Sequence, residues 1–375
     1  MRVRESRAAG VLADMRILVV GDWHSELHEQ AVFDALAELG HEVESFAWHR
    51  YFQAHGRLGS LVARAQNRFV IGPTVAQLNR DVLALARRFG PEIVFVYRGT
   101  HLFPATVASL RQPPRAGARP AIVLGYNNDD PFAPAQPTSL WRHFIAGVPI
   151  YDAVLAYREH NLAEFRAAGA RRVRMLRSWY MPQRNHPVQL DATDREKYGC
   201  DVVFIGHHEP DQRTTLLEAV TQAGVDLKLF GHGSDWNPVL ARSPALRQLS
   251  PVHLVWGSDY NKALCGAKIA LCFLSKLNRD TYTRRCFEIP ASGTMLLSEY
   301  SDDLASMYAP GVEADYFRDA ASLVAQLHRY LADDALRQSV AAAGARRVRE
   351  DGHDVVSRMR DLLAWVDGWR GESTQ

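Results

Sequence analysis

Charged residues that could bind a nucleotide lie close together in the stretch 280–293. Asp280 and Glu288 are eight positions apart, and Arg285 lies three positions before Glu288. On one helix Arg285 and Glu288 would be neighbours, and an ionised carboxylate can accept hydrogen bonds from both hydroxyls of a ribose. Gly293 would allow the tight turn that leads into the next strand. The alternative is an ordinary surface ion pair on a helix, and the spacing alone leaves both interpretations open.

Glycines at the ends of predicted strands could bring the backbone close to a diphosphate. Gly206 ends the run 201–206, and Arg213 follows in the next predicted helix. The free N–H groups at a helix start and the helix dipole favour an anion there, and Arg213 could add a bidentate contact. Gly231 and Gly257 end two later strands in the same way. None of these loops contains a GxGxxG or P-loop pattern.

Other polar residues near these loops allow a functional and a structural interpretation. Lys276 precedes the stretch 280–293 and could neutralise phosphate charge, or it could be a solvated loop cation. The adjacent His207 and His208 would not converge on one metal ion, and Asp129-Asp130 lacks the spaced carboxylates of a DxD motif. We therefore expect no metal site.

The predicted first half offers its own candidates for chemistry. Asp22 and His24 follow the run 16–21, and Asp130 follows the run 121–126. A carboxylate or an imidazole at such a place could position a hydroxyl group or take its proton. Aspartate is also favoured in turns and at helix N-caps, so a structural role stays open. For His24 the alternative is a partly buried histidine at the head of an amphipathic helix.

The elements that would position these residues alternate between strands and helices. Short apolar runs such as 16–21, 92–97 and 201–206 are typical of buried parallel strands. Between them, apolar residues recur at helical spacing, for example in 24–39 and 74–89. The alternation predicts an α/β protein with doubly wound, Rossmann-like sheets.

A break in this alternation divides the chain into two domains. Between 177 and 199 prolines are frequent and no apolar period is visible. Two such domains imply a central cleft, with ligands at the carboxyl ends of the strands. The predicted units are a first domain at 1–180 (with 1–14 a frayed extension), a linker at 181–199, a second domain at 200–351, and a last helix at 352–375. This helix could cap the second domain or cross back to the first.

Length and composition fit a two-domain globular enzyme. The 375 residues are 47% hydrophobic and 23% charged, which excludes a disordered, collagen-like or coiled-coil chain. A net charge of +2 gives no reason to expect nucleic acid. No run reaches the about 18 apolar residues of a membrane span, although peripheral membrane contact stays open. Four cysteines without a CxxC pattern and the lack of a secretory signal predict a cytoplasmic protein.

The second half resembles a known family. Its pattern Arg285-Cys-Phe-Glu288-x-x-Ala-Ser-Gly293, followed by Leu296-Leu297-Ser298, Asp302-Asp303-Leu304 and Tyr308-Ala-Pro-Gly311, is similar to the donor domain of CgeB-type (spore maturation protein B) glycosyltransferases. These have the GT-B fold and are group 1-like, so the resemblance implies an acceptor domain at 1–180 and a nucleotide-sugar donor domain at 200–351. In the wider group a Glu-x7-Glu motif places its first carboxylate at the sugar and its second at the ribose. Here Asp280 replaces the first Glu, so the resemblance implies a sugar role for Asp280 and a ribose role for Glu288.

The resemblance implies a hexosyltransferase-like enzyme that moves a sugar from a nucleotide-diphosphate donor to a hydroxyl group of a glycan, a lipid-linked acceptor or a small molecule. No cofactor and no metal are expected, because positive charge and helix N-termini would stabilise the leaving diphosphate. Two alternatives stay open: a nucleotide-sugar epimerase of the same fold, and a nucleotide-binding module without activity. The expected donor-binding residues are Gly206, Arg213, Gly231, Gly257, Lys276, Arg285, Glu288 and Gly293; the expected catalytic residues are Asp280, Asp22, His24 and Asp130.

Overall fold

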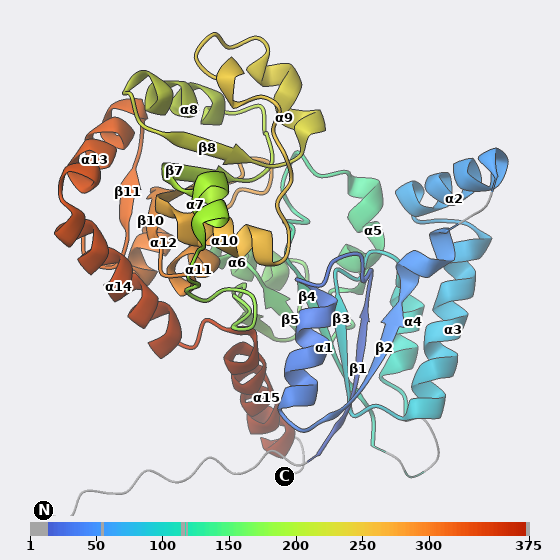
Figure 1. The fold of residues 1–375 in the computed structure, drawn as a ribbon. Coiled ribbons are helices and arrows are strands. Elements are labelled where there is room, and N and C mark those ends of the chain that lie inside the picture. The colour runs from blue at the N-terminus through green and yellow to red at the C-terminus, as the bar shows by residue number, and fades with distance from the viewer. Residues whose placement is uncertain (1–13, 54–55, 114–116, 118, 373–375) are drawn as a thin grey trace, which may run out of the picture.

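Two separate parallel sheets, each covered by helices on both faces, make up the protein (Figure 1). The computed structural model describes residues 14–53, 56–113, 117 and 119–372. Of the extension predicted at 1–14, residues 1–13 lie outside these ranges. Within them, every helix falls short of the length and apolarity needed to cross a bilayer. The doubly wound α/β architecture predicted from the sequence is confirmed.

The first sheet has six strands in the order β2-β1-β3-β4-β5-β6, and all its strand pairs are parallel. Its central strands are mostly apolar, because helices cover both faces of the sheet. The strands are β1 (Arg16–Gly21), β2 (Glu42–Ala47), β3 (Ile93–Tyr97), β4 (Ile122–Asn127), β5 (Ala153–Ala156) and β6 (Val173–Met175).

The second sheet has five parallel strands in the order β11-β10-β9-β7-β8. In each sheet the first strand lies between the second and the third, so chain direction across the sheet reverses beside β1 and beside β7. Ligands of doubly wound sheets bind at such a switch point. The strands are β7 (Cys200–Ile205), β8 (Leu227–Phe230), β9 (Ala267–Cys272), β10 (Met295–Glu299) and β11 (Asp315–Phe317).

Helices connect the strands, and short ones were the hardest to foresee. The helix predicted over 24–39 begins only at Glu29, because 22–28 form a loop after β1. The predicted linker contains a seven-residue helix that Asp191 caps by accepting from the Asp194 N–H at 2.8 Å. The helices of the first domain are α1 (Glu29–Glu38), α2 (Arg57–Phe69), α3 (Pro73–Phe89), α4 (Pro104–Leu110), α5 (Thr138–Gly147) and α6 (Glu159–Ala167), with a 3-10 turn, η1 (Trp48–Phe52). Those that follow are α7 (Ala192–Tyr198), α8 (Arg213–Gln222), α9 (Gly233–Leu240), α10 (Ser258–Gly266), α11 (Arg285–Ala291), α12 (Asp302–Met307), α13 (Ala320–Ala332), α14 (Asp334–Glu350) and α15 (Val355–Glu372).

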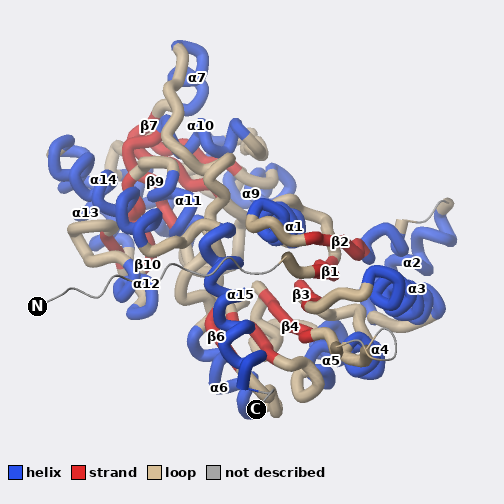
Figure 2. Tube along the Cα trace, turned by 90° about the horizontal axis from the view of Figure 1, so that it is seen from below, coloured by secondary structure: helices blue, strands red, loops and turns tan. Residues whose placement is uncertain are grey.

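The last helix ties the two domains together. α15 leaves the second domain and packs against α1 of the first domain (Figures 1 and 2). Its apolar residues Met359, Leu363 and Val366 are buried in a core cluster that also contains residues of both sheets. Of the two positions expected for this helix, the structure has the one that crosses back to the first domain.

Candidate functional site

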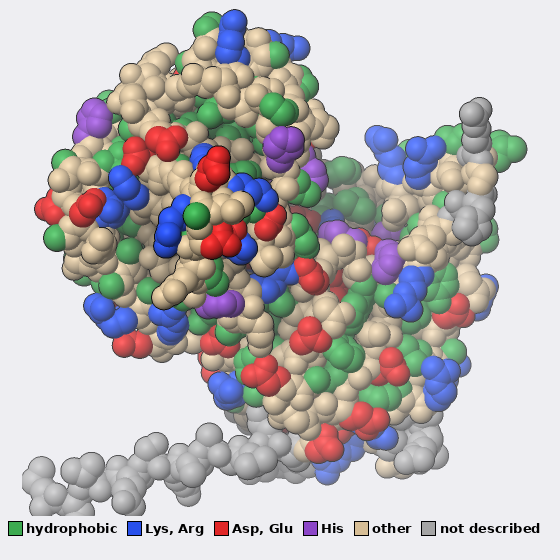
Figure 3. Space-filling model, viewed as in Figure 1, with side chains coloured by type: hydrophobic (Ala, Val, Ile, Leu, Met, Phe, Trp, Pro, Cys, Tyr) green, Lys and Arg blue, Asp and Glu red, His purple; other side chains and the backbone are tan. Residues whose placement is uncertain are grey.

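A cavity of about 440 Å³ opens between the two domains, at the carboxyl ends of both sheets. Figure 3 shows this hollow between the two halves of the molecule. From the second domain it is lined by the end of β7, the loop after β9 and the start of α11. From the first domain it is lined by the loop after β1 and the loop after β4. Both switch points therefore face one shared space.

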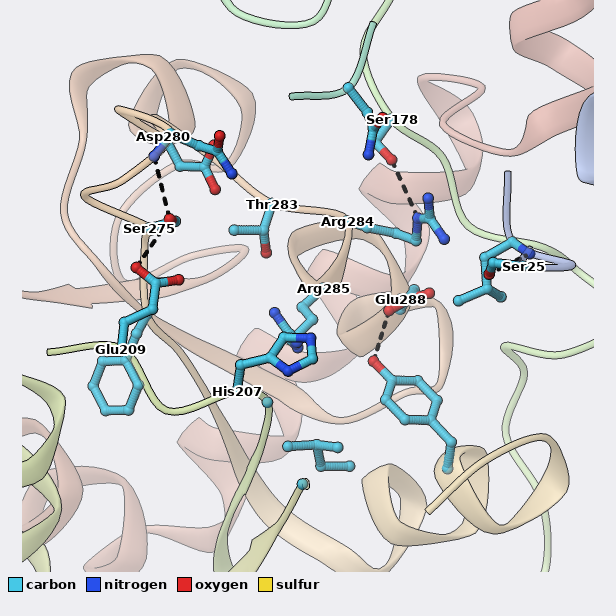
Figure 4. A pocket seen from close by; sticks show the side chains of 18 of the residues that line it. Ser25, Ser178, His207, Glu209, Ser275, Asp280, Thr283, Arg284, Arg285 and Glu288 are labelled. Carbon is cyan, nitrogen blue, oxygen red and sulfur yellow. Dashed lines mark hydrogen bonds between the residues drawn. The ribbon is translucent and has the colours of Figure 1, made fainter. Parts of the chain in front are cut away.

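Glu288 lies on the wall of this cavity, in the first turn of α11 (Figure 4). The Tyr260 hydroxyl donates to its Oε2 at 2.6 Å. Burial and the neighbouring Glu288 carboxylate raise the pKa of Tyr260 well above its ordinary value, so the phenol keeps its proton and stays a donor. The hydrogen bond fixes the carboxylate at the cavity wall, with its charge available to a ligand hydroxyl.

Two adjacent arginines give the cavity positive charge. Arg284 and Arg285 both line it, and neither forms an ion pair with a carboxylate in the part of the chain that is described. Arg284 donates from Nε to the Ser178 Oγ at 3.4 Å (Figure 4). Burial opposes charge on Arg285, yet the pKa of its guanidinium lies above its ordinary value, and the neighbouring Glu288 carboxylate contributes to this shift. Two charged guanidinium groups are thus directed toward one space that an anion can enter.

Asp280 lines the same cavity and is held from the other domain. Arg158, directly after β5, donates from Nε to Asp280 Oδ1 at 2.8 Å, and its second nitrogen contacts the same oxygen. Arg158 also donates to the Asn128 carbonyl at 3.1 Å and lies over the Tyr157 ring. Burial raises the pKa of Asp280, and the Arg158 charge opposes that shift. The turn residue expected from the sequence is therefore one half of a buried ion pair between the domains.

The other predicted catalytic residues lie outside the cavity lining. His24 is half exposed and pairs with Asp22 through Nδ1 and Oδ2 at 3.0 Å. Asp130 is fully buried and accepts from the Asn161 side chain at 3.0 Å. The contacts of Asp22, His24 and Asp130 are thus made to other protein groups rather than into the shared space. The His24 ring lies 5.4 Å, centroid to centroid, from that of His28, which does line the cavity.

Asp130, His160 and Glu164 form the one group within the described ranges whose ligand atoms could surround a metal ion. The Arg279 side chain already lies among them: its Nε donates to Asp130 Oδ2 at 2.7 Å and its Nη atoms to Glu164 at 2.9 Å. The guanidinium brings one positive charge between the two carboxylates. This cluster connects the loop after β9 with the first domain.

The four glycines among the remaining donor-binding candidates divide into two pairs. Gly206 and Gly231 line the cavity, and a Cβ on Gly231 would lie 2.3 Å from the Gly206 carbonyl oxygen, so no side chain fits there. Gly257 and Gly293 adopt positive φ values of 57° and 82° in turns and lie outside the lining.

The two cations among these candidates are already engaged by protein groups. Lys276 also lies outside the lining and pairs with Glu299 at 3.2 Å. Arg213 lines the cavity but donates to Asp211 and to the His207 carbonyl. These hydrogen bonds of Arg213 stabilise the loop between β7 and α8.

His28 is a lining residue that the sequence analysis missed. It lies in the loop between β1 and α1, and its Nδ1 is buried with no hydrogen-bond partner in the described structure. Burial, assisted by the Arg284 charge, lowers the pKa of His28 well below its ordinary value, so the ring is neutral. We expected a helix from residue 24, but residues 22–28 form a loop. This loop places His28 rather than His24 in the lining of the cavity.

Comparison with known proteins agrees with this architecture. Residues 212–364 match a family described as glycosyl transferase-like. No curated protein matches the chain in sequence. Among solved structures, HepE of Anabaena with UDP-glucose has a TM-score of 0.64 at 13% identity, over 94% of this chain and 100% of that chain. Sucrose-phosphate synthase from Thermosynechococcus elongatus has a TM-score of 0.66 at 13% identity, over 94% and 99%. The α,α-trehalose 6-phosphate synthase of Burkholderia multivorans has 0.63 at 13%, over 96% and 98%.

These structures share the arrangement of two facing Rossmann-like domains, and the family match covers most of the second domain. The cavity lies between the domains, where the carboxyl ends of both sheets meet. Residues 212–364 thus match the glycosyl transferase-like family, and the whole chain has the GT-B fold.

Proposed function

We propose that the cavity binds a nucleotide-diphosphate sugar and transfers its sugar to a hydroxyl group of an acceptor. The observation that carries this proposal is the pair Arg284 and Arg285, two charged side chains without carboxylate partners in the described chain, beside the carboxylate of Glu288. A diphosphate needs cations, and a ribose needs an acceptor for its hydroxyls. The complexes of HepE with UDP and with UDP-glucose support the proposal by fold.

In this proposal the second domain holds the donor. Glu288 accepts the ribose hydroxyls, and the Tyr260 hydrogen bond keeps its carboxylate in place. Arg284 and Arg285 bind the diphosphate, and their charge stabilises the negative charge that develops on the leaving group. Gly206 and Gly231 let the backbone approach the phosphates closely. Asp280 contacts the transferred sugar from the opposite wall.

The first domain supplies the acceptor side. His28 faces the donor from the loop after β1, and its neutral ring can accept a hydrogen bond or a proton from the attacking hydroxyl. Closure of the domains would exclude water, the competing acceptor. This role replaces the one expected for His24 and Asp22.

We also propose that transfer needs no metal ion and no cofactor, because Arg284 and Arg285 supply the positive charge in the cavity. The finer assignment to the CgeB type rests on the motif from Arg285 to Gly293, and a cytoplasmic location on the cysteine pattern.

The direct test is calorimetry with nucleoside diphosphates and nucleotide sugars, followed by product analysis. We expect one nucleoside diphosphate to bind, and the sugar to appear on an added acceptor or, slowly, on water. A new sugar isomer formed from the donor alone would show an epimerase instead. Nucleotide binding without transfer or hydrolysis would show a binding module, and no nucleotide binding at all would refute the proposal.

A further inference from the structure

Helix α2 exposes its apolar side to solvent. Five of the nine large exposed apolar side chains in the described part of the chain lie in this helix or directly after it. Leu58 is 80% exposed and Val62 is 56% exposed. In a helix that serves only to cover a sheet, the apolar stripe faces inward. We call this set the α2 surface; its members are Leu58, Leu61, Val62, Phe69 and Ile71.

The inner side of the same helix does little apolar packing. Ala63 is its buried side chain in the middle of the helix, and the helix ends at the buried Val70. Arg142 of α5 holds that end by donating to the Val70 carbonyl at 2.8 Å. Leu58, Leu61 and Val62 are spaced so that they share one face of a helix. The exposed stripe is thus a defined surface on an anchored helix, and not a frayed end.

Cations flank this stripe, and no acidic residue accompanies them. The segment 56–72 contains Arg57, Arg64 and Arg68 but neither Asp nor Glu. Arg64 and Arg68 are exposed, and at 100° per residue they lie beside the apolar face rather than opposite to it. Figure 3 shows the basic and apolar side chains together over α2.

We propose that the α2 surface docks on a lipid bilayer that carries anionic headgroups. A helix with an apolar face bordered by Arg side chains lies in the interface, with its apolar side chains among the acyl chains and its cations at the headgroups. A second copy of the chain fits less well. A symmetric pair through α2 would bring the arginines of both copies together, with no carboxylate in the segment to balance them.

The position of α2 connects the proposed membrane contact with the proposed sugar transfer. Strand β2 runs directly into η1 and then to α2, so the helix lies on the carboxyl-end side of the first sheet, as the cavity does (Figure 1). A chain held at a bilayer by this surface would present the acceptor side of the cavity toward the membrane. The bilayer contact itself does not depend on the proposed reaction, and its test needs neither donor nor acceptor.

The test is co-sedimentation of the full chain with vesicles of phosphatidylcholine, alone or mixed with phosphatidylglycerol. We expect binding to the mixed vesicles that weakens as salt is raised. Leu58→Gln/Leu61→Gln/Val62→Gln should lower the affinity by roughly tenfold or more. Arg64→Gln/Arg68→Gln should lower it by about fivefold for each arginine.

Matched controls lie on the second domain. Val312 is 58% exposed, so Val312→Gln makes the same change at the same exposure as Val62→Gln, and Arg346→Gln removes an exposed cation. Both should bind as the wild type does, and unchanged melting temperatures would show that all variants fold. Failure of the wild type to bind mixed vesicles, or full binding by the folded triple variant, would overturn the proposal. So would a concentration-dependent dimer that the triple variant abolishes.

Discussion

Arg158 of the first domain holds Asp280 of the second, with its Nε 2.8 Å from Asp280 Oδ1. The pair is almost fully buried and forms part of the wall of the cavity. Next to it Arg279 binds Asp130 and Glu164, so two consecutive residues of one loop, Arg279 and Asp280, each make an ion pair with the first domain. The loop that carries the proposed sugar contact is therefore also the connection between the domains.

Glu288→Gln should weaken nucleotide binding and leave the fold intact. The amide keeps the shape but removes the charged acceptor of the ribose hydroxyls, a loss of about 1.5–3 kcal/mol. Calorimetry with the preferred nucleoside diphosphate measures the change, with the exposed Glu350→Gln as the matched control. Unchanged nucleotide affinity in Glu288→Gln would remove this residue from the site.

His28→Gln should lower the rate of sugar transfer by roughly 100-fold and change donor affinity little. The reason is that a general base that accepts the proton of the attacking hydroxyl contributes about 100-fold or more to the rate. His24→Gln, a few residues away and outside the cavity lining, should stay close to the wild type. Because burial keeps the pKa of His28 well below its ordinary value, the wild-type rate should not fall as pH is lowered through 6.5. Equal effects of the two substitutions on the transfer rate would contradict the assignment.

Activity should survive EDTA. The cavity has its own cations in Arg284 and Arg285, and the Asp130 cluster already contains the Arg279 guanidinium. Transfer is measured after dialysis against EDTA, with and without added Mg²⁺ or Mn²⁺. Complete loss of activity that a metal ion restores would show that the reaction depends on a metal.

Stability should fall as the solution becomes acidic, in part through His101. Burial lowers the pKa of His101 to about 4, whereas an exposed histidine titrates near 6.5. Between these values the unfolded chain binds a proton that the folded chain does not, so the free energy of unfolding decreases as pH falls. The loss is on the order of 3 kcal/mol from pH 6.5 to 4. Denaturant unfolding across this range should show a shallower decline for His101→Gln, and no change of slope for the exposed His328→Gln.

Local sequence patterns were sufficient for the longer elements but not for the shortest ones. The apolar run 92–97 predicted β3, and the helical period in 74–89 predicted α3, each to within one residue. A strand buried on both faces is a continuous apolar run, whereas a helix buried on one face repeats its apolar residues every three or four positions. The three-residue β6 and the seven-residue α4 are too short for any period to show.

Contacts between distant residues had no local signal. Arg158 and Asp280 are 122 positions apart, so no residue close to Asp280 in the sequence indicates its partner. Likewise the expectation for His24 depended on a helix that would begin near residue 24, whereas α1 begins at Glu29 after a loop that periodicity does not reveal. Glu288 could be proposed from the sequence because its motif is local: Arg285, Glu288 and Gly293 lie within nine residues.

The last prediction separates a role of Asp280 in transfer from its role as the partner of Arg158. Asp280→Asn leaves a buried guanidinium unbalanced, so by itself it should cost about 3–5 kcal/mol of stability and also lower turnover. Arg158→Gln/Asp280→Asn removes both charges together and should regain most of that stability, because a neutral pair leaves no charge uncompensated.

Turnover in the double variant then decides between the two roles. If Asp280 contacts the sugar in the transition state, turnover stays roughly 100-fold below the wild type although the chain is folded, and the rate constant falls more than donor affinity. If Asp280 only balances Arg158, turnover returns together with stability. Recovery of the wild-type rate in the folded double variant would leave the transferred sugar without a carboxylate partner at this position, and the function of the loop after β9 would reduce to holding the domains together.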